Sequence, residues 1–144
     1  MKIQSKELYN ALKKLKITVV SKLPILNYVY MNVKNNTITM FTTDLEKVNK
    51  AIILCVTGEE EEWSTCLPMV LIYNSTCHPI YYVKKYKGYP FMDFIKVCSE
   101  DSDVLNFMYN KLIETVTITG ENYKANFKCF SSDEFPIKFC EEKV

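Results

Sequence analysis

The sequence predicts an α+β domain made of two similar halves, each with the element order strand, helix and three strands. Apolar residues recur at helical spacing in 6–19 and again in 90–99. Residues 23–46 contain the most regular period-two pattern, in which apolar side chains such as Met31 and Val33 alternate with polar or aromatic ones. An internal repeat of element order constrains the fold more than any single motif.

Composition favours one globular domain. The chain has 144 residues, 48% of them hydrophobic and 24% charged, which is enough to bury a sizeable core. Its net charge of +1 gives no global basic field, so a nucleic-acid partner would have to bind a local patch. The first ten residues contain no apolar secretory segment, and the apolar run at 51–56 is too short to span a membrane. We expect a cytoplasmic protein with no membrane partner.

The first half begins with a short strand at 2–4, followed by a helix for which Ser5 is the expected N-cap. Its apolar stripe consists of Leu8, Ala11, Leu12, Leu15 and Val19. Its opposite side carries Lys6, Asn10, Lys13, Lys14 and Lys16. These lysines are either an ordinary solvated face or contacts for the phosphates of a nucleic acid, and the sequence alone does not separate the two.

The other strands follow from local patterns. An Asn35-Asn36 turn joins two strands within 23–46, and a third strand is expected at 48–56, before an acidic loop at 59–62. In the second half, Pro90 opens a helix at its first position. The strands of this half are expected at 64–67, 104–109, 114–119 and 123–130.

Residues 69–89 do not fit the repeat, because they are too long for an ordinary strand-to-helix loop. We expect an extra hairpin, with a turn over the Asn-Ser-Thr-Cys-His-Pro segment at 74–79. Its tyrosines interleave with Lys84, Lys85 and Lys87, a mixture that is able to stack on bases and neutralise phosphates. The alternative is an exposed hairpin with aromatic cross-strand pairs and lysines that merely oppose aggregation.

No catalytic constellation is recognisable. His78 is the only histidine, and its neighbour Cys77 leaves a thiol enzyme as one alternative, although consecutive side chains point apart on a strand. The six cysteines form no C-x-x-C pair, so we expect reduced thiols and no zinc site. We predict no enzymatic activity, no metal and no cofactor.

Three short segments occur in a fixed order: LPIL at 23–26, TTDLE at 42–46 and DEFP at 133–136. With the two repeated halves, they resemble the first domain of the bacterial DNA sliding clamp, the beta subunit and processivity factor of DNA polymerase III. The resemblance implies a DNA-clamp fold, in which two helices pack on curved antiparallel sheets. It divides the chain into a single domain at 1–136 with half-repeats at about 1–58 and 63–131, an insertion at 69–89 and a tail at 137–144.

The same resemblance implies a function. Such a domain contributes to a ring around duplex DNA and contacts the DNA weakly, without sequence specificity. The residues that would contact DNA are Lys6, Lys13, Lys14 and Lys16 on the first helix and Lys22 in the loop after it. The last strand, with Lys124, Asn126 and Lys128, would be the edge that pairs with a neighbouring subunit. Further clamp domains or subunits would be direct partners, and the replicative polymerase and clamp loader indirect ones.

Two features depart from that family. A clamp subunit carries three such domains, whereas one is recognisable here, and Asp93 offsets Lys96 so that the second helix has no basic row. The alternative to a processivity domain is therefore an interaction module with the clamp fold, which pairs through a sheet edge and regulates a clamp or another protein.

Overall fold

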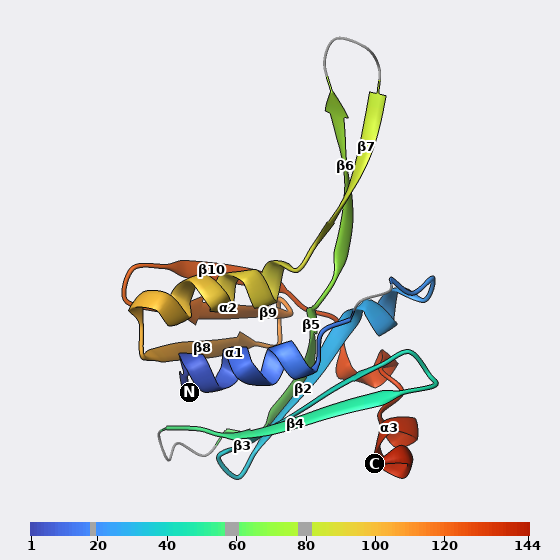
Figure 1. Ribbon diagram of the computed structural model, residues 1–144. Coiled ribbons are helices and arrows are strands. Elements are labelled where there is room, and N and C mark those ends of the chain that lie inside the picture. Colours follow the sequence, from blue (N-terminus) through green and yellow to red (C-terminus); the bar gives the residue numbers. More distant parts are fainter. Residues whose placement is uncertain (18–19, 57–60, 78–81) are drawn as a thin grey trace.

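The computed structural model describes residues 1–17, 20–56, 61–77 and 82–144, with 72–77 and 82–87 described as backbone only. These residues form two four-stranded antiparallel sheets, a two-stranded hairpin and three α-helices (Figure 1). This arrangement confirms the predicted α+β class. In the described part of the chain, no helix is long and apolar enough to cross a membrane.

The two halves have the expected order of elements. The first half contains β1 Lys2–Gln4, α1 Ser5–Lys14, the 3-10 helix η1 Pro24–Asn27, β2 Tyr28–Lys34, β3 Thr37–Thr43 and β4 Val48–Leu54. The second contains β5 Trp63–Pro68, β6 Leu71–Cys77, β7 Tyr82–Gly88, α2 Pro90–Asp101, β8 Val104–Asn110, β9 Thr115–Thr119 and β10 Lys124–Lys128. The 3-10 helix η2 Ser132–Glu134 and helix α3 Ile137–Lys143 follow.

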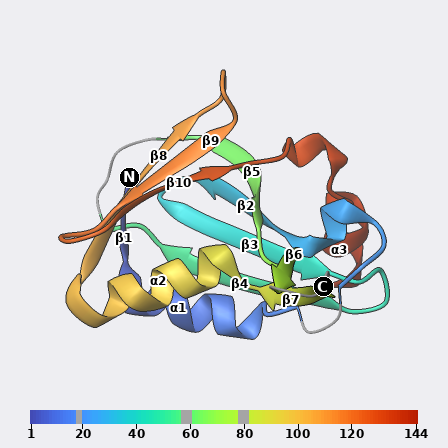
Figure 2. The ribbon, with the colours of Figure 1, turned by 90° about the horizontal axis from the view of Figure 1, so that it is seen from above.

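Each half contributes its first strand to the sheet of the other half. One sheet has the order β1-β8-β9-β10, and the other has the order β4-β3-β2-β5. Helices α1 and α2 lie side by side and cover the same side of both sheets (Figure 2). The exchange of first strands ties the halves into one unit and fixes the two helices as a common layer.

The main core lies between the helix layer and the two sheets. It takes Leu8 and Leu12 from α1, Phe91 and Ile95 from α2, and inward side chains from both sheets. Strands β2 and β3 contribute alternate residues: Val29, Met31, Val33, Ile38 and Met40. All of these side chains are almost completely buried, so the period-two and helical patterns in the sequence identify this core correctly.

The β2–β3 hairpin explains how the chain turns after Lys34. Asn35 and Asn36 both have positive φ, 53° and 57°, which is the backbone of a type I′ two-residue turn. Val33 then pairs with Ile38, so that both strands present their apolar side chains to the core. The hairpin predicted from the alternating pattern is confirmed.

The TTDLE segment forms the β3–β4 turn through its own side chains. The Asp44 carboxylate accepts hydrogen bonds from the backbone N–H groups of Glu46 and Lys47 at 2.9 and 2.6 Å, and these bonds lower the Asp44 pKa. The Thr43 hydroxyl donates to the Lys47 carbonyl at 2.7 Å. In this structure the motif therefore builds a turn.

A second, smaller core lies on the other face of the β4-β3-β2-β5 sheet. Phe135 of the DEFP segment is buried there, with its ring 5.3 Å from that of Tyr30. Helix α3 adds Cys140, which is fully buried. Within the predicted C-terminal tail at 137–144, helix α3 Ile137–Lys143 packs on β3.

Helix α1 is shorter than the predicted 6–19 and begins one residue earlier. Leu15 ends it, and the Thr42 hydroxyl donates to the Leu15 carbonyl at 2.9 Å. The β-branched residues at 17–20 disfavour helix, which is the local reason for the early end. Ser5 is not the N-cap: Gln4 holds that position, and the Ser5 hydroxyl donates across to the Ser102 carbonyl.

Several strand ends differ from the predictions for a common reason, which is pairing between the halves. After β4, the Val56 N–H bonds to the Lys2 carbonyl, and after β10, Phe130 forms a bridge with Cys66. The extra hairpin is present as β6 and β7, but β6 runs through Cys77, so 74–77 are strand and not turn. Val19, 57–60 and His78 lie outside the described residues.

Candidate nucleic-acid interface

Two of the predicted DNA-contacting lysines lie on the side of α1 that faces away from the core. Lys6 and Lys13 are exposed, opposite the buried stripe that contains Leu8 and Leu12. Seven residues make nearly two helical turns, so both side chains leave the helix in similar directions, about 10 Å apart along its axis. The Lys13 ammonium also lies 5.0 Å from the centre of the Tyr9 ring. Helix α1 therefore holds two positive charges on a rigid element.

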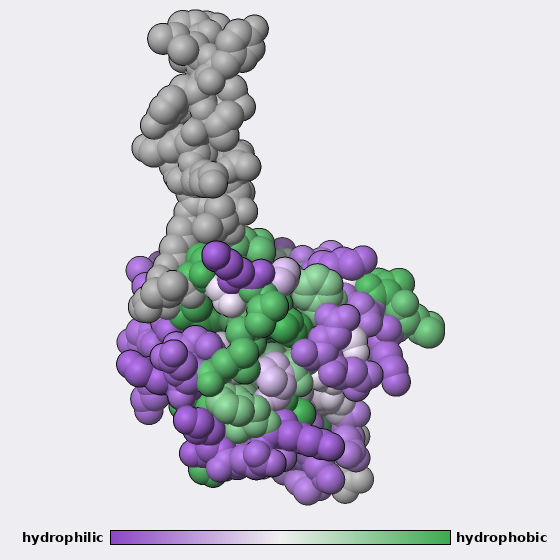
Figure 3. Space-filling model, turned by 90° about the vertical axis from the view of Figure 1, so that its right-hand side faces the viewer, coloured by the Kyte–Doolittle hydropathy of each residue, from purple (hydrophilic) through white to green (hydrophobic). Residues whose placement is uncertain are grey.

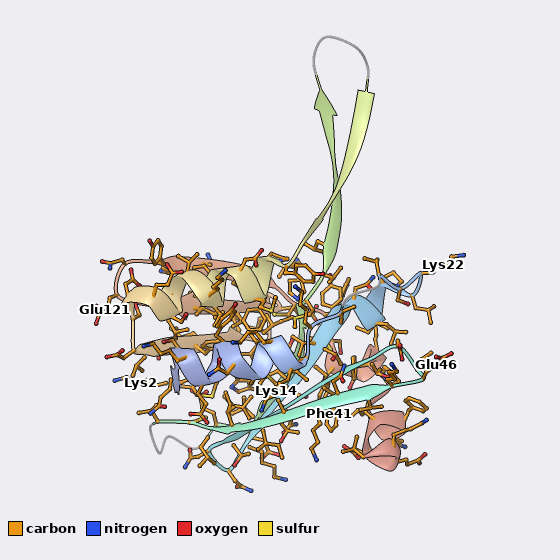
Figure 4. The ribbon with its side chains drawn as sticks, viewed as in Figure 1. Lys2, Lys14, Lys22, Phe41, Glu46 and Glu121 are labelled. Carbon is orange, nitrogen blue, oxygen red and sulfur yellow. The ribbon has the colours of Figure 1, made fainter. Side chains whose placement is uncertain are left out.

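Lys14 leaves the same helix on its flank. Figure 4 shows it between α1 and the sheet that contains β4. Together with Glu7 and Asn10, it lines a hollow of about 360 Å³ whose other wall is formed by residues 50–53 of β4. The Glu7 carboxylate shares this flank, so Lys14 adds less net positive charge to the surface than Lys6 or Lys13.

Lys16 and Lys22 are not part of the helix. Lys16 follows the end of α1, which corrects its predicted place on the helical face, and its ammonium lies 4.6 Å from the centre of the Tyr89 ring. Lys22 is exposed in the loop before η1 and points outward, away from Lys14 (Figure 4). Figure 3 looks onto that side of the molecule and shows hydrophilic residues around a hydrophobic centre.

The fold also adds a lysine that the sequence patterns missed. Lys47, from the β3–β4 turn, lines a hollow of about 280 Å³ together with Lys16, Ser21 and Asp44. No spacing rule links Lys16 and Lys47, because only the tertiary fold brings the end of α1 to this turn. The Asp44 carboxylate is part of the same hollow and offsets one of the two lysines.

Helix α2, beside α1 in the same layer, is acidic on its exposed side. Asp93, Glu100 and Asp101 are exposed, and Lys96 is the exposed lysine among its described residues. This extends the sequence observation that Asp93 offsets Lys96. The positive charge of the helix layer is thus concentrated on α1 and at its C-terminal end.

The predicted subunit interface is an exposed edge strand. Within the described residues, β10 pairs with β9 alone, and Lys124, Asn126 and Lys128 are all exposed. The opposite face of β10 is anchored by Phe127, whose ring lies 5.7 Å from that of Phe91. The strand therefore has a fixed position, an unpaired edge and charged side chains that limit indiscriminate pairing.

The described cysteines have the environment of core residues. Burial raises the pKa of the Cys66 thiol to about 12, and burial also raises that of Cys129. Both thiols therefore stay protonated near neutral pH. In the described part of the chain, no three His, Cys, Asp or Glu side chains converge as metal ligands. The Cys77 side chain and His78, which the thiol-enzyme alternative requires, lie outside the described residues.

The described residues thus form two adjacent helices over two antiparallel sheets, with first strands exchanged between the halves. Comparisons with family models and with curated proteins found no match for the sequence. Solved sliding clamps, in contrast, superimpose on the structure.

The DNA polymerase sliding clamp of Pseudomonas aeruginosa matches with a TM-score of 0.72 and 17% identity, over 94% of this chain and 31% of that one. The DNA polymerase III beta subunit of Thermotoga maritima gives 0.69 and 18%, and the beta clamp of Helicobacter pylori 0.70 and 18%, each over 94% of this chain and 31% of the other. The chain thus has the fold of one domain of a sliding clamp and spans about a third of such a subunit.

Proposed function

We propose that this chain acts as a sliding-clamp domain, which contributes to a ring around duplex DNA and supports processive DNA synthesis without reading base sequence. The observation that carries the proposal is the position of Lys6 and Lys13 on the outer side of the helix layer of a clamp fold. Lysines on a rigid helix neutralise phosphates but make no contacts that distinguish bases. The proposed role is that of a scaffold in the cytoplasm and not that of an enzyme.

The proposal includes the partners of such a scaffold. Duplex DNA would bind weakly to α1, with Lys14, Lys16 and Lys22 as outlying contacts. Further clamp domains or subunits would pair with β10, and the replicative polymerase and clamp loader would act through the assembled ring. Topological enclosure would supply the processivity, so the individual phosphate contacts would be weak and sensitive to salt.

The expected binding behaviour tests the proposal directly. The chain should bind unrelated duplexes of equal length with the same affinity, because no contact reads the bases. The logarithm of the binding constant should fall linearly with that of the salt concentration, with a slope of about −2 to −5 for a handful of lysine contacts. Fluorescence anisotropy at four salt concentrations measures both. Binding that prefers one sequence, or that ignores salt, would contradict the proposal.

A second candidate function is a clamp-fold interaction module that pairs through a sheet edge and regulates a clamp or another protein. The unpaired edge of β10 favours it, as does the acidic exposed side of α2, which is unfavourable for DNA. Both candidates use Lys124, Asn126 and Lys128, but only the first requires the lysines of α1.

A single substitution tests assembly through β10. We expect the chain alone to be a monomer or a weak dimer that pairs through this edge. Asn126→Pro should remove any dimer, because proline has no N–H to donate and is poorly accommodated in a paired strand. Light scattering over a concentration series measures the mass, and Asn126→Ala, which keeps the N–H, is the matched control. A dimer that persists in the proline variant would place the contact on another surface.

A further inference from the structure

Strands β6 and β7 form an arm that stands away from the body of the domain (Figure 1). They pair only with each other in the described part of the chain, from Leu71 with Gly88 to Cys77 with Tyr82. A two-stranded hairpin without a further layer is marginally stable in water. A partner surface that binds the arm would therefore stabilise it.

The arm concentrates positive charge. Residues 63–92 contain Lys84, Lys85 and Lys87 and no aspartate or glutamate. The whole chain has 18 basic and 17 acidic residues, so without these three lysines the rest has 15 basic and 17 acidic ones. The small positive charge of the protein is thus due to the arm.

The backbone register fixes which residues of β6 stand opposite these lysines of β7. Lys84 pairs with Ser75, Lys85 with Asn74 and Lys87 with Ile72, so every lysine stands opposite an uncharged residue. The arm itself contains no carboxylate that could offset these charges, because 63–92 contain no aspartate or glutamate.

The base of the arm meets the lysines of α1. Tyr89 joins β7 to α2, and the Lys16 ammonium lies 4.6 Å from the centre of its ring. The base of the arm therefore lies next to Lys16, which follows the C-terminal end of α1. The neighbouring helix α2 offers a poorer path, because Asp93 stands beside the base of the arm.

We propose that the β6–β7 arm is a second contact for the phosphate backbone of the DNA that α1 binds. This inference rests on the proposed function. It assigns to the arm the positive charge that α2 lacks, and it implies a DNA path from the outer side of α1 past its C-terminal end and along the arm. The contact is with phosphates and is independent of sequence.

The test compares two triple variants of the full chain that lose the same charge. The arm variant carries Lys84→Gln, Lys85→Gln and Lys87→Gln. The control carries Lys34→Gln, Lys111→Gln and Lys138→Gln, which are exposed lysines at the β2–β3 turn, at the β8–β9 turn and on α3. Circular dichroism confirms that both variants fold, and anisotropy with one duplex at several salt concentrations measures binding.

The arm variant should bind at least about tenfold more weakly than the control at low salt, and its salt slope should be shallower, by up to about 0.9 for each phosphate contact that is lost. Equal affinities and slopes in the two variants would overturn the inference and would leave the arm to a protein partner. If the arm variant and the control bind equally while variants of the α1 lysines still lose binding, the proposed function stands without the arm. If the unmodified chain does not bind DNA at all, both proposals fail.

Discussion

Phe107→Ala is expected to lower the free energy of unfolding by about 3 to 5 kcal/mol. Phe107 is fully buried on β8, and its ring meets that of Phe91 on α2 edge to face, with centroids 6.4 Å apart. The truncation would leave a cavity where the helix layer rests on the sheet. Because domains of this size are stable by only about 5 to 15 kcal/mol, the variant should be close to unfolded. Urea denaturation followed by circular dichroism measures the loss.

The next residue on the same strand is the control. Met108 faces the other side of the sheet and is 62% exposed. Met108→Ala should change the free energy of unfolding by no more than about 0.5 kcal/mol, because it removes little buried contact. Equal losses in the two variants, or a loss below about 1 kcal/mol for Phe107→Ala, would contradict the placement of α2 over this sheet.

The periodic parts of the sequence predicted the fold well, because the alternating residues of the strands and the residues at helical spacing are buried in the same core. The alternation through Val29, Met31 and Val33 identified the buried face of β2, and the i, i+3, i+4 spacing from Phe91 identified that of α2. Asn35-Asn36 fixed the register between β2 and β3, because two adjacent residues with positive φ permit only one short turn.

The ends of elements were harder to predict, because contacts between distant segments act there together with local propensity. Helix α1 ends where Thr42, from β3, binds the carbonyl of Leu15. Serine is a favoured N-cap residue, yet the Ser5 hydroxyl donates a hydrogen bond to the Ser102 carbonyl, and Gln4 holds the N-cap position. Neither partner is close in sequence, so local propensity contains no trace of them.

The candidate site was only partly predictable for the same reason. Helical spacing correctly placed Lys6 and Lys13 together, but it also assigned Lys16 to a helix that ends before it. The contact between Lys16 and Tyr89 and the approach of Lys47 depend on tertiary packing. Helical spacing identified lysines on one face of α1, whereas the position of Lys16 beside the base of the arm is set by the tertiary fold.

Charge reversal on α1 is expected to have the largest effect on binding. Lys6→Glu, Lys13→Glu and Lys14→Glu together should weaken duplex binding at least about a hundredfold at low salt, because three attractive phosphate contacts become repulsive. Glutamates near the C-terminal end of α1 also oppose the helix dipole, by about 0.3 to 1 kcal/mol each. A parallel variant with glutamine at the three positions removes this effect and should still lose most of the binding.

The most direct test of a DNA-binding helix layer is one anisotropy titration of the same duplex against three proteins at matched salt. These are the unmodified chain, the α1 charge-reversal variant and a control with Lys34→Glu, Lys111→Glu and Lys138→Glu, which has the same net charge as the variant. We expect the control to stay within about tenfold of the unmodified chain, while the α1 variant binds at least about a hundredfold more weakly. Equal binding by the α1 variant and the control would contradict this expectation, because DNA would then respond to net charge and not to the lysines of α1.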